Sequence, residues 1–252
     1  MLQQSASDGS RARHVRRQGV EVAPAEHAGG PVPSGSPLGL EKIPMRWTAM
    51  RGKDYVEEEL LGRPVHAAEC RAVMQFFAKT AVGREVKSVR RIQNRRLWRI
   101  YTETRELVKA KKINAGEANE HFLWHGAGNS RTGAGSTEQV KHQGFDGRFS
   151  NANPAGIWLS TYSGYSLDYC ETFAGGTKQM LLVLATLGYI SIDDGTGRRP
   201  RMHGGELGDS HHCGGTSQGH ARVDDQVGGG SNNAYVVYNG QQLYPAFAVT
   251  FA

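Results

Sequence analysis

The chain has 252 residues, of which 38% are hydrophobic and 8% aromatic, and it carries a formal net charge of +6. This length and composition suffice for one sizeable globular domain. No apolar run approaches the roughly 20 residues that span a bilayer, and the first twenty residues lack the apolar stretch of a secretory signal. We therefore expect neither a membrane protein nor an exported one.

The cysteines favour a reducing compartment. There are three of them, an odd number, and they lie far apart without a CxxC pair that would indicate a disulfide framework or a zinc cluster: Cys70, Cys170 and Cys213. An intracellular location, in the nucleus or the cytoplasm, is the expectation.

The amino-terminal part differs in composition from the rest. Residues 1–45 are rich in Gly, Pro, Ser, Ala and Arg without hydrophobic periodicity, which is typical of a flexible basic tail. Four arginines in its first half also fit an organelle transit peptide, so targeting stays open. The folded domain is expected over residues 46–252.

Two helices are predicted after the tail. The range 67–80 has an apolar stripe at helical spacing, made of Cys70, Val73, Phe76 and Phe77. A second helix follows Ile92-Gln93-Asn94 and runs to about Lys112, with its arginines turned away from the apolar face. The segment 84–112 holds eleven Lys and Arg against three Glu, so most of the positive charge belongs to this helix and its lead-in.

Beyond Glu120 the sequence is typical of β-structure, with short apolar segments separated by glycine. The run 180–187 is almost continuously apolar, as in a strand that is buried on both faces. Asn239-Gly240 is a turn signal that predicts antiparallel pairing of the last two strands. The other expected strands are 122–124, 156–159, 189–192, 235–238 and 247–251, and a short helix is expected to begin in 163–170.

A glycine-rich segment interrupts this pattern. Residues 193–231 hold eleven of the 33 glycines and few apolar residues, which predicts a long surface loop. Imidazole and thiolate groups in this loop are potential zinc ligands, but their spacing fits no established finger, and a polar loop without metal is favoured. These residues are His203, His211, His212, Cys213 and His220.

One ordered set of segments carries the functional signal. It consists of His125-Gly126, Gly156-Ile157-Trp158-Leu159-Ser160, Tyr165-Ser166-Leu167-Asp168-Tyr169, Tyr235-Val236-Val237-Tyr238 and Gln242-Leu243-Tyr244-Pro245. In this order and spacing they resemble the catalytic domain of the poly(ADP-ribose) polymerase family, the diphtheria-toxin-like ADP-ribosyltransferases. The segment 89–98, which contains Arg91-Ile92-Gln93-Asn94, resembles the lead-in of the mono-ADP-ribosylating branch.

The resemblance implies a fold and a reaction. The fold is α+β, with two small antiparallel sheets that form a cleft for NAD and a helical lead-in. The reaction transfers ADP-ribose from NAD to a protein side chain, the chain itself included, and releases nicotinamide. Its transition state is a ribosyl oxocarbenium ion, so the enzyme mainly positions the sugar and excludes water.

The resemblance also implies roles for individual residues. The Gly126 backbone would hold the nicotinamide carboxamide, with the Ser166 hydroxyl as a further donor, and His125 would donate a hydrogen bond to the adenosine ribose. Trp158 and Tyr169 would stack on the two faces of the nicotinamide ring. The loop 144–154, with Phe145 packing against the donor, would close over it. Outside this framework His125 would be a structural histidine and Trp158 a core aromatic, and Tyr165 and Tyr238 are expected to pack.

Two positions depart from the family pattern. Trp158 stands where the family has tyrosine, and Ala234 stands where polymer-forming members have the catalytic glutamate. Asn233 would point to the opposite strand face and Asn232 would lie about 7 Å away along the strand, at roughly 3.3 Å per residue, so neither replaces that carboxylate. We therefore expect mono-ADP-ribosylation, with impaired activity as a consequence of Ala234.

Two other interpretations stay open. The chain could be an inactive relative, whether Ala234 is natural or engineered, that binds NAD or ADP-ribose as an interaction module. The basic helix could contact nucleic acid through phosphates, although its aromatic residues Trp98 and Tyr101 are assigned to the core by their spacing and a solvated face is favoured.

Overall fold

The structure is a computed structural model that describes residues 47–128, 136–150, 155–192, 209–213 and 234–252. The expected tail, 1–45, and most of the glycine-rich segment 193–231 lie outside these ranges. In the described ranges no helix has the length and apolarity to span a membrane.

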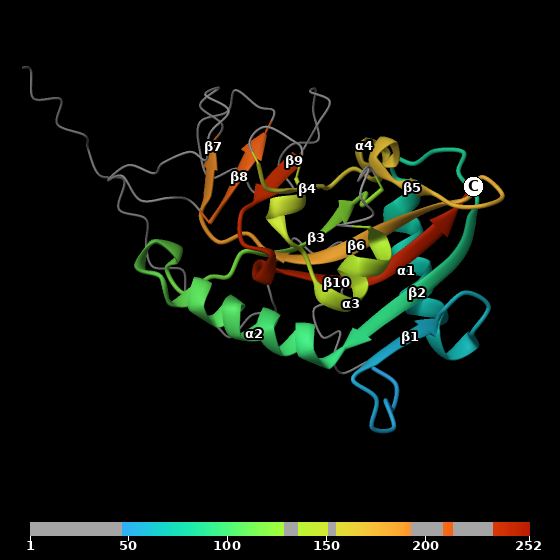
Figure 1. The fold of residues 1–252 in the computed structure, drawn as a ribbon, viewed down its shortest axis with the longest axis horizontal. Helices are drawn as coiled ribbons and strands as arrows, with labels where there is room; N and C mark the ends of the chain where they lie inside the picture. Colours follow the sequence, from blue (N-terminus) through green and yellow to red (C-terminus); the bar gives the residue numbers. More distant parts are fainter. Residues whose placement is uncertain (1–46, 129–135, 151–154, 193–208, 214–233) are drawn as a thin grey trace, which may run out of the picture. The chain divides into compact units, whose positions relative to one another are not determined.

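A twisted, mostly antiparallel sheet organises the fold (Figure 1). Its strand order is β1-β2-β10-β6-β3-β4-β9-β8-β7, and β5 pairs with β6 beside this path. Only the pair β7–β8 is parallel among the described strands. The strands are β1 (Tyr55–Glu59), β2 (Val86–Asn94), β3 (Glu120–His125), β4 (Ile157–Ser160), β5 (Glu171–Thr172), β6 (Lys178–Thr186), β7 (Ile190–Ile192), β8 (Ser210–Cys213), β9 (Ala234–Val237) and β10 (Leu243–Phe251).

The α+β class is confirmed, and the division into two sheets takes a particular form. One hydrogen-bonded path contains two groups of strands: β1, β2, β10, β6 and β3 form the first, and β4, β9, β8 and β7 form the second. These two groups meet at β3 and β4, which share a single residue pair, Trp124 with Ser160. The two expected sheets are therefore joined at one narrow junction, immediately before His125.

The predicted helices are confirmed. They are α1 (Ala67–Ala78), α2 (Arg95–Ala110) and α4 (Ser163–Ser166). The structure adds α3 (Thr137–Gln143), which the sequence did not predict, and the short 3-10 turns η2 (Pro64–His66), η3 (Lys112–Asn114), η4 (Gly147–Phe149), η5 (Leu167–Tyr169) and η6 (Gly240–Gln242). The apolar stripe of α1 is buried at Cys70, Val73, Phe76 and Phe77, as its spacing predicts. Arg95, Arg96 and Arg99 of α2 are exposed, while Leu97 and Tyr101 are buried.

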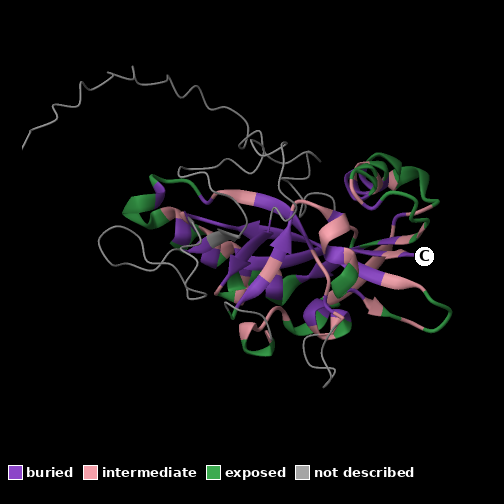
Figure 2. Ribbon diagram, turned by 90° about the horizontal axis from the view of Figure 1, so that it is seen from above, coloured by how far each residue is buried: buried purple, intermediate pink, exposed green. Residues whose placement is uncertain are grey.

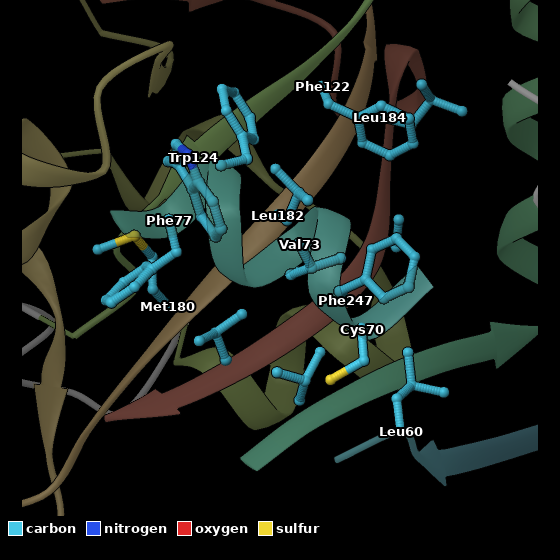
Figure 3. Packing of buried hydrophobic residues seen from close by; sticks show 14 of the residues in the cluster. Leu60, Cys70, Val73, Phe77, Phe122, Trp124, Met180, Leu182, Leu184 and Phe247 are labelled. Atoms are coloured by element: carbon cyan, nitrogen blue, oxygen red, sulfur yellow. The ribbon is translucent and has the colours of Figure 1, made fainter. Parts of the chain in front are cut away.

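Strand β6 separates two apolar clusters because its side chains alternate between the sheet faces. Met180, Leu182 and Leu184 face the cluster that includes α1 and α2, where Phe77 packs against Trp124 with ring centroids 5.6 Å apart (Figure 3). Leu181, Val183 and Ala185 face the cluster that includes Val140 of α3 and residues of β4 and β9. Figure 2 shows the strands buried between partly exposed helices. The prediction of a doubly buried strand is confirmed.

The lead-in segment forms a corner of polar contacts. The Asn94 side chain accepts a hydrogen bond from the Leu97 amide and so caps α2, and its Nδ2 donates to the carbonyl of Lys141 at the end of α3. The Tyr244 hydroxyl donates to the Ile92 carbonyl and accepts from the Asn94 amide. This corner fixes α2 and α3 against the β2–β10 strand pair.

The predicted pairing of the last two strands is wrong. Strand β9 lies between β4 and β8, whereas β10 lies between β2 and β6. The Asn239 side chain accepts from the Gln241 amide, so Asn239-Gly240 begins the 3-10 turn η6 rather than a hairpin. A side chain at Gly240 would lie 2.1 Å from the Phe145 carbonyl oxygen, which explains why glycine is needed there.

The glycine-rich segment also contains a strand that its composition conceals. Residues 210–213 form β8, which joins β9 to β7. The surface-loop prediction therefore fails over these four residues, since a Ser-His-His-Cys run has no apolar alternation. His203 and His220 lie outside the described residues, and within those ranges no three His, Cys, Asp or Glu side chains are grouped to hold a metal.

Candidate active site

His125 is the last residue of β3, directly after the junction with β4. Its Nδ1 lies 2.8 Å from the carbonyl oxygen of Trp158, which belongs to β4. The strands diverge beyond their single shared pair, so this side-chain contact continues the connection where backbone pairing stops. The imidazole is thereby held between the two strand groups.

This contact fixes the tautomer of His125. A carbonyl oxygen only accepts, so Nδ1 carries the hydrogen and, in the neutral ring, Nε2 is left as an acceptor. Desolvation lowers the pKa of His125 below its ordinary 6.5, although the Trp158 carbonyl opposes that shift. The ring is therefore neutral at pH 7, and a ribose hydroxyl would donate to Nε2. The donation by His125 that the sequence predicts would require the protonated ring.

Gly126 and Gly128 lie against the turn that follows α4. A side chain at Gly126 would be 2.6 Å from the Ser166 carbonyl oxygen and 2.8 Å from the Tyr169 carbonyl carbon, and one at Gly128 would be 1.8 Å from the Glu171 amide. The Gly128 amide donates to the Tyr169 carbonyl at 2.7 Å. Only glycine allows this close approach.

The backbone of Gly126 is free to bind a ligand amide. Within the described residues, neither its N–H nor its C=O forms a hydrogen bond. A partly buried donor and acceptor on one residue match the two polar groups of a primary carboxamide. This fit applies to any ligand with an amide at the end of a flat ring.

The Ser166 hydroxyl is engaged inside the protein. The residue is 3% exposed, and its Oγ donates to the Trp124 carbonyl at 3.2 Å. Its lone pairs are left to accept, while donation to a ligand would require the hydroxyl to leave that carbonyl. This residue also links the turn after α4 to the strand that carries His125.

Aromatic side chains surround these groups. Tyr169 is 44% exposed, so one of its faces is available for stacking, and its ring lies 5.4 Å from that of Tyr165. Tyr165 packs with Trp158 and Tyr238 against Ala234 and Val236, so the packing predicted for Tyr165 and Tyr238 is confirmed. Phe145 meets the His125 ring edge-on, with centroids 5.2 Å apart and an interplanar angle of 78°.

Ala234 faces the same side of the sheet as Trp158. It pairs with Ser160 across β4, and Val236 pairs with Trp158, so the four residues share one face. Ala234 is fully buried. A larger residue at position 234 would therefore have to displace the aromatic rings around it.

Sequence reasoning missed Ser160. Its hydroxyl is buried opposite Ala234, where its oxygen accepts from the Tyr162 amide at 2.9 Å. The sequence directs attention along the strand to Asn232 and Asn233, which lie outside the described residues. Only the strand register identifies Ser160 as the polar neighbour of Ala234 across the strand pair.

The structure brings most of the predicted site together. His125, Gly126, Ser166, Tyr169 and Phe145 are connected by the contacts given above, and Trp158 joins them through its carbonyl. The Trp158 and Tyr165 side chains pack against the same pair, Ala234 and Val236. The part of the predicted closing loop at residues 151–154 is outside the described ranges. Trp98 and Tyr101 of the basic helix pack with Tyr244 in the core, as their spacing predicts.

Comparison with known proteins identifies relatives at modest sequence identity. The chain is 28% identical to human protein mono-ADP-ribosyltransferase PARP14 over 58% of its length. It is 25% identical to mouse protein mono-ADP-ribosyltransferase PARP11 over 84% of its length, and 26% identical to human PARP11 over 75%. No family model matches the chain.

These relatives are protein mono-ADP-ribosyltransferases by name, and the chain is similar to them at modest identity. The chain spans only part of these relatives: 8% of human PARP14, 66% of mouse PARP11 and 58% of human PARP11. The similarity therefore concerns the domain that contains His125 and Gly126, and the relatives have further regions to which it does not extend.

Proposed function

We propose that this chain binds NAD and transfers single ADP-ribose units to protein side chains. The observation that carries the proposal is the packing of Gly126 into the Ser166–Tyr169 turn, with its backbone N–H and C=O left free beside the His125 ring. The homologues, all mono-ADP-ribosyltransferases by name, support the same reaction.

The residues have distinct tasks in this proposal. Gly126 binds the nicotinamide carboxamide, while Tyr169 and Trp158 stack on the nicotinamide ring, with about 0.5–1.5 kcal/mol for each aromatic pair beyond plain burial. His125, with its neutral Nε2, accepts a hydroxyl of the adenosine ribose. Phe145 packs edge-on against the imidazole and helps to exclude water from it.

NAD supplies the leaving group. The bond between C1′ of the ribose and the pyridinium nitrogen breaks, and nicotinamide departs as a neutral molecule. An acceptor oxygen or nitrogen then bonds to C1′; a carboxylate acceptor has no proton to lose, while a hydroxyl or amine acceptor releases its proton to solvent. The chain contributes mainly position and desolvation, because Ala234 provides no carboxylate to stabilise the oxocarbenium charge or to activate a sugar hydroxyl.

Transfer of single units follows from Ala234. Chain growth needs a base at the sugar hydroxyl that attacks the next donor, whereas an acceptor carboxylate is already nucleophilic. Incubation with NAD should add discrete ADP-ribose masses to the chain or to an acceptor protein, with no polymer ladder, as measured by intact-protein mass spectrometry. Absence of any adduct, with nicotinamide release at the buffer rate, would contradict the proposed activity.

A matched pair of variants tests the role of position 234. Ala234→Glu should increase the transfer rate and yield short chains, while Ala234→Gln, which has the same shape without the charge, should not. Both variants lose some stability because the position is fully buried, so melting temperatures must be compared. Equal rates for the two variants, with equal folding, would overturn the placement of Ala234 beside the reacting sugar.

The second candidate is a binding module without transferase activity. It is favoured by one observation, the apolar environment of Ala234, at the position where the family resemblance implies a glutamate in polymer-forming members. In that case NAD or nicotinamide analogues would raise the melting temperature while no adduct forms. The two measurements together decide between the candidates.

A further inference from the structure

A cavity of about 640 Å³ opens on α1, away from the proposed donor site. Its walls come from the end of β1, the turn η2, one side of α1 and the start of β2. None of its lining residues belongs to the site built around His125. The volume lies in the range of about 300–1,000 Å³ that is usual for small-molecule sites.

The floor of this cavity, here called the α1 pocket, is apolar. Leu60 and Phe77 are fully buried beneath it, and Met74 and Val86 pack against the same core cluster. Figure 3 shows Leu60, Cys70 and Phe77 at the edge of this core. Aliphatic walls with one flexible methionine suit an alkyl chain, because methionine adapts to irregular apolar shapes.

The rim of the pocket is positively charged. Arg63, Arg71 and Arg84 line it, and no lining residue is acidic. All three are exposed, and none is paired with a carboxylate in the part of the chain that the structure describes. By contrast, Arg90 on the neighbouring strand contacts both Glu57 and Glu59. The rim therefore presents uncompensated guanidinium groups, which prefer carboxylate or phosphate oxygens.

We propose that the α1 pocket binds a single-chain amphipathic anion, with its alkyl chain on the Leu60–Phe77 floor and its anionic head at the arginine rim. An apolar floor beside an arginine rim favours this class of ligand. A purely polar anion would leave the apolar floor in contact with water, and a neutral or cationic amphiphile would leave the arginines unpaired. Either a carboxylate or a sulfate head group can pair with the arginines of the rim.

Calorimetry with the full chain and a homologous series of probes tests this proposal. Decanoate should bind with one site per chain and octanoate, which is two methylenes shorter, about 15-fold more weakly, because each buried methylene contributes about a fourfold change in affinity. Decyltrimethylammonium, which has the same chain length and the opposite charge, should bind at least tenfold more weakly than decanoate. Equal affinity for anion and cation would overturn the proposal.

Variants locate the binding site. The double variant Arg71→Gln and Arg84→Gln should weaken decanoate binding at least fivefold, and Ala67→Trp, an exposed lining position, should block it sterically. Arg95→Gln, an exposed arginine on α2, is the matched control and should leave the affinity unchanged. Melting temperatures verify that each variant is folded. Unchanged decanoate affinity in folded pocket variants would refute the assignment.

Three controls distinguish other occupants. Saturating benzamide should not displace decanoate, since displacement would place decanoate in the proposed donor site instead. Light scattering should give the same mass with and without Ala67→Trp; a change would make a second copy of the chain the occupant. Sedimentation of the chain with phosphatidylglycerol vesicles, in the absence of affinity for free decanoate, would likewise overturn the proposal in favour of a membrane surface.

Discussion

At the scale of single residues, His125 combines a fixed tautomer with a lowered pKa. The Trp158 carbonyl holds the hydrogen on Nδ1, and desolvation disfavours the charged ring. The lowered pKa sets the sign of the pH dependence of folding stability. An unfolded chain takes up a proton on this histidine below pH 6.5 and the folded chain does not, so the unfolded state gains protons first.

This difference predicts an acid-sensitive stability. The neutral His125 ring contributes to the free energy of unfolding. This contribution is fully present above the ordinary pKa of 6.5 and is lost as the pH falls through 6.5 toward the lower pKa of the folded state. Melting temperatures from pH 8 to 5 should fall more steeply for the native chain than for His125→Gln, which cannot titrate. Parallel curves would mean that the ring titrates normally in the folded protein.

The glycines after His125 give a second prediction at this scale. Gly128→Ala places a methyl group 1.8 Å from the Glu171 amide, so the turn after α4 must move, at a cost of about 1–3 kcal/mol or more. Gly147→Ala is the control, because its nearest neighbours lie at 3.8 Å or beyond. Urea unfolding should show a large loss for Gly128→Ala and a change within about 0.5 kcal/mol for Gly147→Ala.

At the scale of elements, the corner around Asn94 joins three of them. One amide side chain caps α2 and also satisfies a carbonyl at the end of α3. Loss of an N-cap alone costs about 0.5–2 kcal/mol, and a buried carbonyl without its donor adds about 1–3 kcal/mol. The segment 89–98, which contains Asn94 and resembles the family's lead-in, therefore has a structural role: it joins these elements.

Substitution at the two asparagine caps separates these contributions. Asn94→Ala should lower the free energy of unfolding by about 2–4 kcal/mol, whereas Asn94→Asp, which keeps the capping oxygen, should lose less. Asn239→Ala removes the cap of η6 at an exposed position and should cost about 1 kcal/mol or less. A smaller effect at Asn94 than at Asn239 in chemical denaturation would contradict the account of the corner.

The elements also show what the sequence could predict. Helices α1 and α2 follow from apolar spacing within one segment, because a helix makes its hydrogen bonds locally. The partners of β9 and β10 depend on residues far away in the chain. The dipeptide Asn239-Gly240 alone predicted a hairpin, because a local turn signal does not identify these distant partners. In the structure Asn239 caps η6, and Gly240 lies against Phe145.

In the site, too, some features follow from a local sequence pattern and others depend on distant parts of the chain. The glycine and histidine of the β3 end could be predicted from their sequence pattern, but the tautomer of His125 depends on a carbonyl 33 residues later. Ser160 and the burial of Ala234 follow from the β4–β9 register, which no local pattern encodes.

At the scale of the whole molecule, the sheet is least continuous at the β3–β4 pair. Strands β6 and β10 have partners on both sides and are buried on both faces, whereas β7 ends the path. Amide hydrogen exchange should therefore be slowest in β6 and β10 and faster in β7, which ends the path, and in its neighbour β8, since the end of a sheet opens without global unfolding. Mass-spectrometric exchange on peptic peptides measures this order, and uniform protection across all strands would contradict it.

The proposed site fixes one orientation of NAD, with nicotinamide at Gly126 and Tyr169 and the adenosine ribose at His125. Calorimetric titration of benzamide and NAD into the native chain, His125→Ala and Tyr169→Ala tests that orientation most directly. Tyr169→Ala should weaken both ligands about threefold to tenfold, because both stack on its ring. His125→Ala should weaken NAD by a similar factor and leave benzamide unchanged. Loss of benzamide binding in His125→Ala, or full retention of both ligands in Tyr169→Ala, would contradict the proposed site.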